Sequence, residues 1–133
     1  MDENKTVITF GTFDLLHIGH VNIIKRAKNY GSRLVVGVSS DQLNYNKKSI
    51  YPIYNEVDRM EIMRNIKGVD KVFLEESLEM KRQYILDNKA DILVMGSDWE
   101  GKFDDMGDIC KVVYLPRTKD ISSTMVKSII KNI

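Results

Sequence analysis

The chain has 133 residues, of which 43% are hydrophobic and 29% are charged, enough for one packed core and too few for two ordinary domains. Twenty basic residues face nineteen acidic ones, and the formal charge of +1 creates no overall field that would recruit nucleic acid or an anionic membrane. We therefore expect a single domain, residues 1–133, with no nucleic-acid or membrane partner and with anion binding confined to local sites.

The cysteine content and the apolar segments bear on the cellular location of the protein. Cys110 is the single cysteine, which excludes an internal disulfide. No apolar run is long enough to span a bilayer, and the first residues lack the basic and apolar stretches of a signal peptide. We therefore expect a cytoplasmic location.

Short apolar runs rich in β-branched residues alternate with segments of helical period, which is typical of parallel βαβ units. Predicted strands occupy residues 6–10, 33–39, 71–74, 92–96 and 111–115, and predicted helices occupy residues 18–27, 56–66, 79–88 and 125–133. This order predicts an α/β fold: a Rossmann-like, three-layer α/β/α architecture around a central parallel five-stranded sheet.

The polar stretch 41–54 has no clear period, so it predicts a loop or a broken helix and is the longest candidate for a lid. Parallel sheets collect ligands at the carboxyl ends of their strands. Residues that follow the strand ends should therefore converge on one site. The strand ends concerned are Phe10, Val38, Met95 and Leu115.

The only two histidines, His17 and His20, flank Gly19 directly after the first predicted strand. Imidazole N–H groups donate to phosphate oxygens, and a helix that begins near Gly19 directs free amides and its positive end to the same place. Gly19 also lets the backbone pass close to a ligand. A zinc site is disfavoured because the chain has no third histidine and one distant cysteine, although carboxylates such as Asp14 could complete one. The pair therefore predicts a phosphate site.

Three consecutive hydroxyl residues, Ser122, Ser123 and Thr124, join the last predicted strand to the last helix. On its own, this pattern is an ordinary helix N-cap. With the Arg117 guanidinium five residues earlier, it also forms a second phosphate cradle at the same edge of the sheet. Two helix N-termini at one edge suit a triphosphate.

Residues 11–14, 17–20 and 121–124 resemble the signatures of the cytidylyltransferase-like nucleotidyltransferase superfamily. Within that superfamily, residues 95–104, which include Asp98 and Trp99, and residues 114–118 resemble the small bacterial glycerol-3-phosphate cytidylyltransferases. The resemblance covers nearly the whole chain. It implies transfer of CMP from CTP to glycerol 3-phosphate, which gives pyrophosphate and CDP-glycerol, a precursor of teichoic acid or surface polysaccharide.

The resemblance also implies cofactor, partner and residue roles. Mg²⁺ would be carried by the triphosphate without direct protein ligands, with Asp14 the nearest candidate to touch it through water, and the protein would be a homodimer. Catalytic roles fall to His17, His20, Lys47 and Arg117, and acceptor binding falls to Asp14, Lys47 and Lys81. The nucleotide would be held by Thr12, Phe13, His17, Ile18, Gly19, His20, Lys48, Asp98, Arg117, Thr118, Ile121, Ser122, Ser123 and Thr124.

The chain departs from the family pattern in three places. An extra residue between positions 49 and 59 leaves Lys47 and Lys48 as alternatives for one role. Lys67 replaces an arginine and so loses the bidentate fork, and Leu78 stands where glycerol-type members tend to carry tryptophan. Another acceptor (a sugar or alditol phosphate, phosphoethanolamine or FMN), ATP in place of CTP, or a nucleotide-binding regulatory module without turnover therefore remain alternatives.

Some of these residues have plainer explanations. Single lysines are most often solvated, and Asp98 with Trp99 could form a strand-end turn with an aromatic plug. Arg59 could simply pair with Glu56 or another carboxylate. The apolar residues of the predicted helix 56–66 could serve a dimer interface or the core.

Overall fold

In the computed structural model, which describes residues 4–133, five parallel strands form one sheet in the order β3-β2-β1-β4-β5. The strands are β1 (Thr6–Gly11), β2 (Arg33–Ser39), β3 (Lys71–Glu75), β4 (Ile92–Gly96) and β5 (Lys111–Leu115). The helices are α1 (Ile18–Lys28), α2 (Asp41–Lys48), α3 (Glu56–Arg64), α4 (Lys81–Asp87) and α5 (Ser123–Lys131), with short 3₁₀ helices η1 (Ser97–Trp99) and η2 (Asp104–Asp108). The predicted Rossmann-like α/β fold is confirmed.

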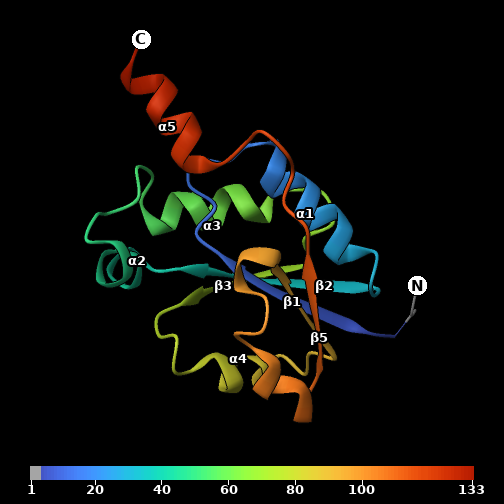
Figure 1. The fold of residues 1–133 in the computed structure, drawn as a ribbon. Helices are drawn as coiled ribbons and strands as arrows, with labels where there is room; N and C mark the ends of the chain where they lie inside the picture. The colour runs from blue at the N-terminus through green and yellow to red at the C-terminus, as the bar shows by residue number, and fades with distance from the viewer. Residues whose placement is uncertain (1–3) are drawn as a thin grey trace.

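Helices cover both faces of the sheet (Figure 1). Ile24 of α1 and Met63 of α3 are fully buried in a cluster on one face, and Ile85 of α4 is buried in a second cluster on the other. Along β1, Val7 belongs to the first cluster and Ile8 to the second, because successive side chains of a strand point to opposite faces. The sheet and the helices packed against its two faces therefore form three layers.

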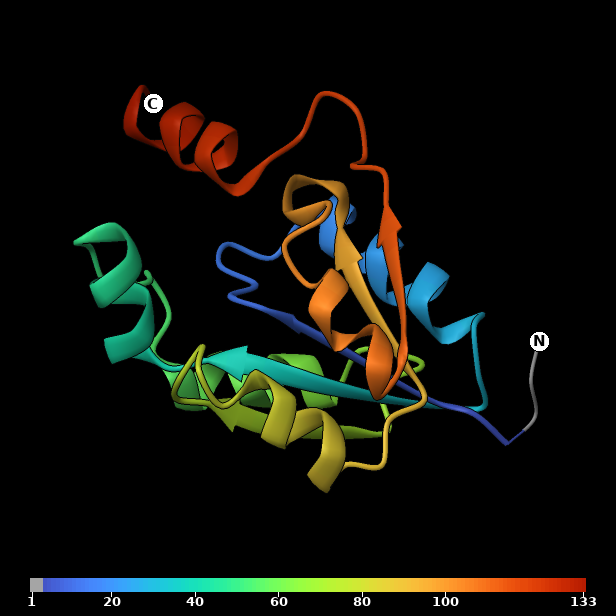
Figure 2. The same ribbon diagram turned by 60° about the horizontal axis from the view of Figure 1, so that its bottom comes forward.

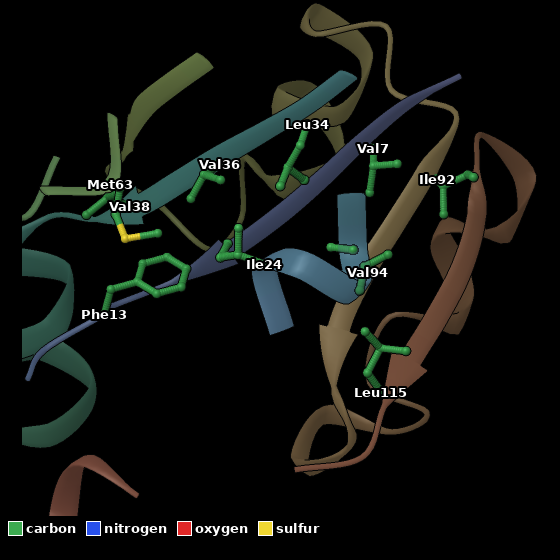
Figure 3. Close-up of a cluster of buried hydrophobic side chains, with 11 residues drawn as sticks. Val7, Phe13, Ile24, Leu34, Val36, Val38, Met63, Ile92, Val94 and Leu115 are labelled. Carbon is green, nitrogen blue, oxygen red and sulfur yellow. The ribbon is translucent and has the colours of Figure 1, made fainter. Parts of the chain in front are cut away.

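The larger cluster joins four strands to α1 and α3 (Figure 3). Val7, Val36, Val94 and Leu115 come from β1, β2, β4 and β5, and they surround Ile24. Burial of one such side chain contributes roughly 1.5–3 kcal/mol. This apolar contact holds the strands in place and thereby sets the positions of the loops that follow them.

Gly37 of β2 makes room for two aromatic rings on the opposite face. A Cβ at this position would lie 2.6 Å from Cδ1 of Phe10 and 2.8 Å from Cζ of Phe73. Without that Cβ, the two rings meet edge to face with their centroids 5.8 Å apart. The glycine therefore lets Phe10 reach the end of the sheet where Lys81 lies.

The strand order creates a crevice at the carboxyl ends of the central strands. From β1 the chain adds β2 and β3 on one side, then crosses to add β4 and β5 on the other. In open parallel sheets such a reversal point is where ligands bind. In Figure 2, α2, η1 and α5 all lie on the side of the molecule to which the strand arrows point.

The polar stretch 41–54 is a helix followed by a loop, so the predicted alternative of a loop throughout is wrong. Ser40 caps α2, because its Oγ accepts a hydrogen bond from the Leu43 N–H at 3.0 Å. Leu43 and Asn44 are the buried residues of this helix. A short helix with so few apolar positions has no recognisable period, and its cap is the signal that could have located it.

Three apolar residues of the predicted helix 56–66 belong to the core, whereas Val57 is 68% exposed. Met63 is fully buried, and Met60 and Ile66 pack against the same cluster. By contrast, three apolar side chains of α5 are exposed: Met125, Ile129 and Ile130 have exposed fractions of 36%, 57% and 52%. Within residues 4–133, no helix combines the length and the apolar character that crossing a membrane requires.

Candidate functional site

One cleft of about 540 Å³ lies at the carboxyl edge of the sheet. The structure brings together along it nearly all of the site residues predicted from the sequence: Thr12, Phe13, Asp14, His17, Gly19, His20, Lys47, Lys48, Lys81, Asp98, Arg117, Thr118, Ile121, Ser122, Ser123 and Thr124. Ile18 is the exception, since its side chain is 56% exposed and lies outside the lining.

The two histidines form the N-terminus of α1 and stack on each other, with their ring centroids 3.9 Å apart. His17 is the N-cap, and its Nδ1 accepts a hydrogen bond from the Gly19 N–H at 3.0 Å. Nδ1 of His20 accepts in turn from the backbone N–H of His17 at 3.1 Å. A ring nitrogen that accepts an N–H bond carries no proton, so the proton of each neutral ring is on Nε2. Each imidazole therefore offers an Nε2–H donor to a ligand in the cleft.

Both rings are neutral at pH 7. Burial lowers the pKa of His17, and the nearby Arg117 lowers it further. Burial also lowers the pKa of His20 to about 4, with His17 adding to the effect and Asp14 opposing it. A phosphate bound beside the rings would favour their charged forms and raise both pKa values. The pair is therefore able to donate hydrogen bonds to a bound anion, and the anion would favour protonation of both rings.

A glycine is needed at position 19 for the packing of the His17 ring as well as for close approach of a ligand. A Cβ at this position would lie 2.7 Å from Cε1 and 2.9 Å from Nδ1 of His17. The glycine therefore lets the His17 ring fold back over the start of the helix. The same Cβ position is 3.5 Å from Cγ2 of Ile121, which shows how closely the second cradle approaches the first.

The start of α5 is tied to the loop after β1 and to α1. Ser122 is an ordinary N-cap, since its Oγ accepts from an N–H of the first turn at 3.1 Å, and its own O–H remains available for a ligand. Ser123 Oγ donates to the Leu15 carbonyl at 3.2 Å. Thr118 Oγ1 accepts from the Asn22 amide at 3.0 Å. The two predicted phosphate cradles thus form one connected surface.

Arg117 and Asp98 form an exposed ion pair at the mouth of the cleft. Nη1 of Arg117 lies 3.4 Å from Oδ2 of Asp98, and the side chains are 54% and 62% exposed. Such a pair is worth about 0–1 kcal/mol, so Arg117 is free to turn toward an anion. Trp99, 39% exposed, lies beside this pair in the lining and packs against Phe103 at 5.5 Å between ring centroids.

The carboxylate of Asp14 is held by the protein. It accepts hydrogen bonds from the N–H groups of Ile53 at 2.7 Å and Tyr54 at 3.1 Å, and Lys127 Nζ of α5 lies 3.1 Å away. Burial opposes ionisation, but these three donors outweigh it and hold the pKa of Asp14 below its usual value. Asp14 therefore fastens the loop after α2 and the helix α5 to the loop after β1, and its contact with an acceptor or with Mg²⁺ stays a prediction.

Thr12 and Phe13 are fixed before any ligand binds. Thr12 Oγ1 donates to Oδ1 of Asn44 at 2.9 Å. The Phe13 ring belongs to the larger core cluster and packs edge-on against His20, with centroids 5.5 Å apart. The loop between β1 and α1 is therefore preorganised from both α2 and the core.

Lys81 and Glu75 form a buried pair at the β3 end of the cleft. Lys81 Nζ lies 3.1 Å from Oε2 of Glu75, and the side chains are 4% and 2% exposed. The ammonium also lies over the rings of Phe10 and Phe103, at 4.1 and 4.7 Å from their centroids. Burial lowers the pKa of Lys81, and Glu75 opposes this shift. The sequence predicted Lys81 at the site and did not identify Glu75.

Lys47 and Lys48 reach the same cleft from the last turn of α2. Both residues are exposed overall, but the ammonium end of Lys47 is partly enclosed. This burial lowers the pKa of Lys47, with Glu75 opposing and Lys81 contributing to the lowering. The β3 end of the cleft therefore concentrates positive charge around one carboxylate.

Arg59 is the main organising residue that the sequence did not reveal. Its side chain is fully buried, with Nε donating to the Tyr54 carbonyl at 2.9 Å and Nη1 donating to those of Thr12 at 3.1 Å and Ser39 at 2.7 Å. Nη2 lies 2.7 Å from Oδ1 of Asp41, so the predicted pairing with a carboxylate is confirmed. An arginine on a polar helix face normally predicts solvation, which is why its role as a hub was missed.

Two of the departures from the family pattern, Leu78 and Lys67, differ in where they lie relative to the cleft. Leu78 lines the cleft and is 41% exposed, so its identity bears directly on what the cleft accepts. Lys67 is exposed and lies outside the lining. The replacement of arginine at Lys67 therefore leaves the walls of the cleft unchanged.

Comparison with known proteins identifies one family. A family model described as Cytidylyltransferase-like matches residues 8–129. The chain is 51% identical over 124 residues to the glycerol-3-phosphate cytidylyltransferase of Bacillus subtilis, covering 92% of this chain and 95% of that protein. It is 42% identical over 125 residues to the glycerol-3-phosphate cytidylyltransferase of Staphylococcus aureus, covering 92% of each.

A solved structure shares the fold. The lipopolysaccharide core biosynthesis protein from Thermoplasma volcanium superposes with a TM-score of 0.74 at 28% identity, over 86% of this chain and 98% of that one. The motif-based assignment of residues 11–14, 17–20 and 121–124 to this superfamily is therefore confirmed.

Proposed function

This chain belongs to the cytidylyltransferase-like family, and from that premise we propose that it transfers CMP from CTP to glycerol 3-phosphate, giving CDP-glycerol and pyrophosphate. The observation that carries the proposal is the identity of 51% and 42%, over 92% of this chain, to two glycerol-3-phosphate cytidylyltransferases. This similarity bears out the activity predicted from the sequence. The cleft supports it by bringing together two helix N-termini and several cationic side chains. We also propose that residues 1–133 form one domain, and the cytoplasmic location stays a prediction.

The reaction is a direct displacement at phosphorus. A phosphate oxygen of the acceptor attacks the α-phosphorus of CTP, the bond from that phosphorus to the bridging oxygen of the β-phosphate breaks, and pyrophosphate leaves. An acceptor phosphate is already ionised near pH 7, so no general base is needed. The task of the protein is to align two anions and to stabilise the charge that develops on the α-phosphoryl oxygens.

The neutral histidines suit that task. The Nε2–H groups of His17 and His20 are preset by the hydrogen bonds to their Nδ1 atoms, so no ring reorientation is needed during transfer. The amides at the start of α1 and of α5 supply further donors. Arg117 turns from Asp98 to the nucleotide phosphates, and Lys47 aligns the acceptor phosphate with the α-phosphorus.

Mg²⁺ enters, in this proposal, as a complex with CTP. Three carboxylates line the cleft, of which Asp14 is saturated by its donors, Glu75 lies against Lys81, and Asp98 pairs with Arg117. Residues 4–133 contain no group of three or more histidine, cysteine or carboxylate side chains arranged to hold a metal. This donor set fits a cation held by triphosphate oxygens and water, which would offset the charge of the leaving pyrophosphate.

A second acceptor remains a candidate because of Leu78. This side chain lines the cleft at the position where the glycerol-type pattern favours tryptophan. A smaller side chain there leaves room for another phosphorylated acceptor, such as a sugar or alditol phosphate. ATP in place of CTP, or nucleotide binding without turnover, are the outcomes that a substrate panel would distinguish.

The test is pyrophosphate release by the purified protein with Mg²⁺, with CTP or ATP, and with a panel of acceptors. CTP with glycerol 3-phosphate is expected to give the highest kcat/KM. Release from ATP alone would overturn the choice of nucleotide, and no release with any acceptor would favour the regulatory module.

A matched pair of variants separates the two roles of His17. Asparagine is a strong N-cap that can still accept from the Gly19 amide but has no Nε2–H, so His17→Asn should stay folded and lose at least about 100-fold in kcat. His17→Ala should lose as much activity and also some stability, because it removes the cap. Wild-type turnover by His17→Asn would contradict the donor role.

We propose that the protein is a homodimer that uses an exposed apolar surface. Large apolar side chains on the loop after α2 and at the start of α3 are exposed by 43% or more: Ile50, Tyr51, Ile53, Tyr54 and Val57. Asp14 contacts both this loop and Lys127 of α5, a helix that also exposes Met125, Ile129 and Ile130. Exposed large apolar side chains on elements that are joined in this way are typical of an interface. Sedimentation of a monomer at high protein concentration would contradict the dimer.

A further inference from the structure

The buried carboxylate of Glu75 has one oxygen without an aligned hydrogen-bond donor. Glu75 ends β3 and is 1% exposed, and its Oε1 accepts from Ser39 Oγ at 3.2 Å. Oε2 forms an ion pair with Lys81 Nζ at 3.1 Å, but it makes no hydrogen bond of standard geometry to any residue among 4–133. A buried carboxylate oxygen left in this state is costly, so it requires an explanation.

The position of Glu75 connects it to the second substrate. It lines the cleft from β3, at the opposite edge of the sheet from β5. The histidines follow β1 and the cradle that begins at Arg117 follows β5, so a nucleotide held between them occupies the β1–β4–β5 side. The β2–β3 side, where Lys47 supplies positive charge, is left for the acceptor.

The neighbours of Oε2 leave the missing donor to a ligand. Ser39 already donates to Oε1, and Lys81 supplies charge without a directed hydrogen bond. The rings of Phe10 and Phe103, which lie against the Lys81 ammonium, carry no O–H or N–H group that could donate. A phosphate is repelled by a carboxylate, whereas an alcohol O–H donates to it.

We propose that Oε2 of Glu75 accepts a hydrogen bond from a hydroxyl group of the acceptor and thereby selects alcohol phosphates that carry a further hydroxyl. This inference rests on the proposed function, because it assigns the alcohol end of the acceptor to a place in the same cleft. Lys81 then acts as a positioning residue that holds the Glu75 charge in the wall. Lys47 remains the group that faces the acceptor phosphate.

The test compares glycerol 3-phosphate with propyl phosphate, which has the same carbon chain and phosphate but neither free hydroxyl. At saturating CTP, the wild-type protein should prefer glycerol 3-phosphate by roughly 100-fold in kcat/KM, since a site built to hydrogen-bond a hydroxyl rejects the analogue that lacks it. Glu75→Gln keeps the shape and the acceptor for Ser39 but removes the charged oxygen. It should lower kcat/KM for glycerol 3-phosphate by at least about 10-fold and leave that for propyl phosphate within about 3-fold.

Glu76→Gln is the matched control, because Glu76 is the adjacent carboxylate, is exposed and does not line the cleft. It should leave the preference between the two acceptors unchanged. An equal loss for both acceptors in Glu75→Gln would show that the residue only supports Lys81, and it would overturn the proposal. If that variant does not fold, a wild-type preference below about 3-fold overturns the proposal by itself.

The experiment separates this inference from the proposed function. Turnover of CTP with both acceptors at similar rates leaves the cytidylyltransferase activity intact and removes the role of Glu75. A wild-type protein that binds CTP and uses neither acceptor removes the proposed function, and the inference with it.

Discussion

Replacing Arg59 by lysine should unfold the protein at a much lower denaturant concentration without changing its formal charge. The guanidinium is fully buried and makes four hydrogen bonds, three to backbone carbonyls and one to the Asp41 carboxylate. A lysine ammonium carries its donors on a single atom and cannot reproduce the fork. At least two of the four bonds should therefore be lost, including one to the Ser39 or the Thr12 carbonyl.

The magnitude follows from these contacts. A hydrogen bond to a charged group contributes about 1.5–3 kcal/mol, so losing two costs about 3–6 kcal/mol. Domains are stable by only about 5–15 kcal/mol, so Arg59→Lys should remove at least roughly a fifth of the free energy of unfolding.

Urea unfolding followed by the fluorescence of Trp99, the only tryptophan, measures this change. Arg64→Lys is the control, because Arg64 lies on the same helix, is 48% exposed and is 3.9 Å from Glu61. It should change the free energy of unfolding by less than about 0.5 kcal/mol. A value within about 0.5 kcal/mol of wild type for Arg59→Lys would refute the reasoning that the guanidinium fork, rather than its charge, holds the cleft.

Two further predictions concern the helix that begins at the histidines. In the ligand-free protein, the Cε1–H resonance of His20 should titrate with a midpoint near pH 4, because burial lowers the pKa of this ring. Between pH 6.5 and about 4, the unfolded state therefore binds more protons than the folded state. The free energy of unfolding should fall as the pH falls through that window. A midpoint at or above 6.5 would contradict the buried, neutral ring. Gly19→Ala should lower kcat by at least about 10-fold with little change in the free energy of unfolding, since its Cβ would displace the His17 ring. Gly107→Ala is the control and should leave kcat unchanged, because a Cβ there would meet nothing within 4 Å. Equal kcat values for the two variants would show that the position of the His17 ring is unimportant.

The elements of the fold could be predicted because each has a local signature. The apolar runs of β2 and β4 are buried on both faces, and Ile24 and Ala27 recur at helical spacing on α1. The stretch 41–54 was left as either a loop or a broken helix because the burial of α2 depends on Leu43 and Asn44 alone. The helix starts at His17 and Ser122, which we propose as phosphate cradles, were predictable for the same local reason, since a helix N-terminus and its capping residues are adjacent in sequence.

The charged residues that organise the cleft could not be predicted in this way. Arg59 contacts residues 18, 20 and 47 positions away, and Glu75 meets Ser39 across 36. Whether a charge is solvated or buried depends on what those distant segments place around it. A single charged position on a helix or at a strand end therefore predicts exposure, even where the fold encloses it.

The α/β class, the two helix starts proposed to bind phosphate and the chemistry that His17 and His20 suit follow from the sequence alone, because these properties depend on residues close together in the chain. The strand order, the tautomer of each histidine, the anchoring of Asp14 and the burial of Arg59 and Glu75 required the tertiary structure. The physical reason is that desolvation and hydrogen-bond partners are set by segments that meet only when the sheet has formed.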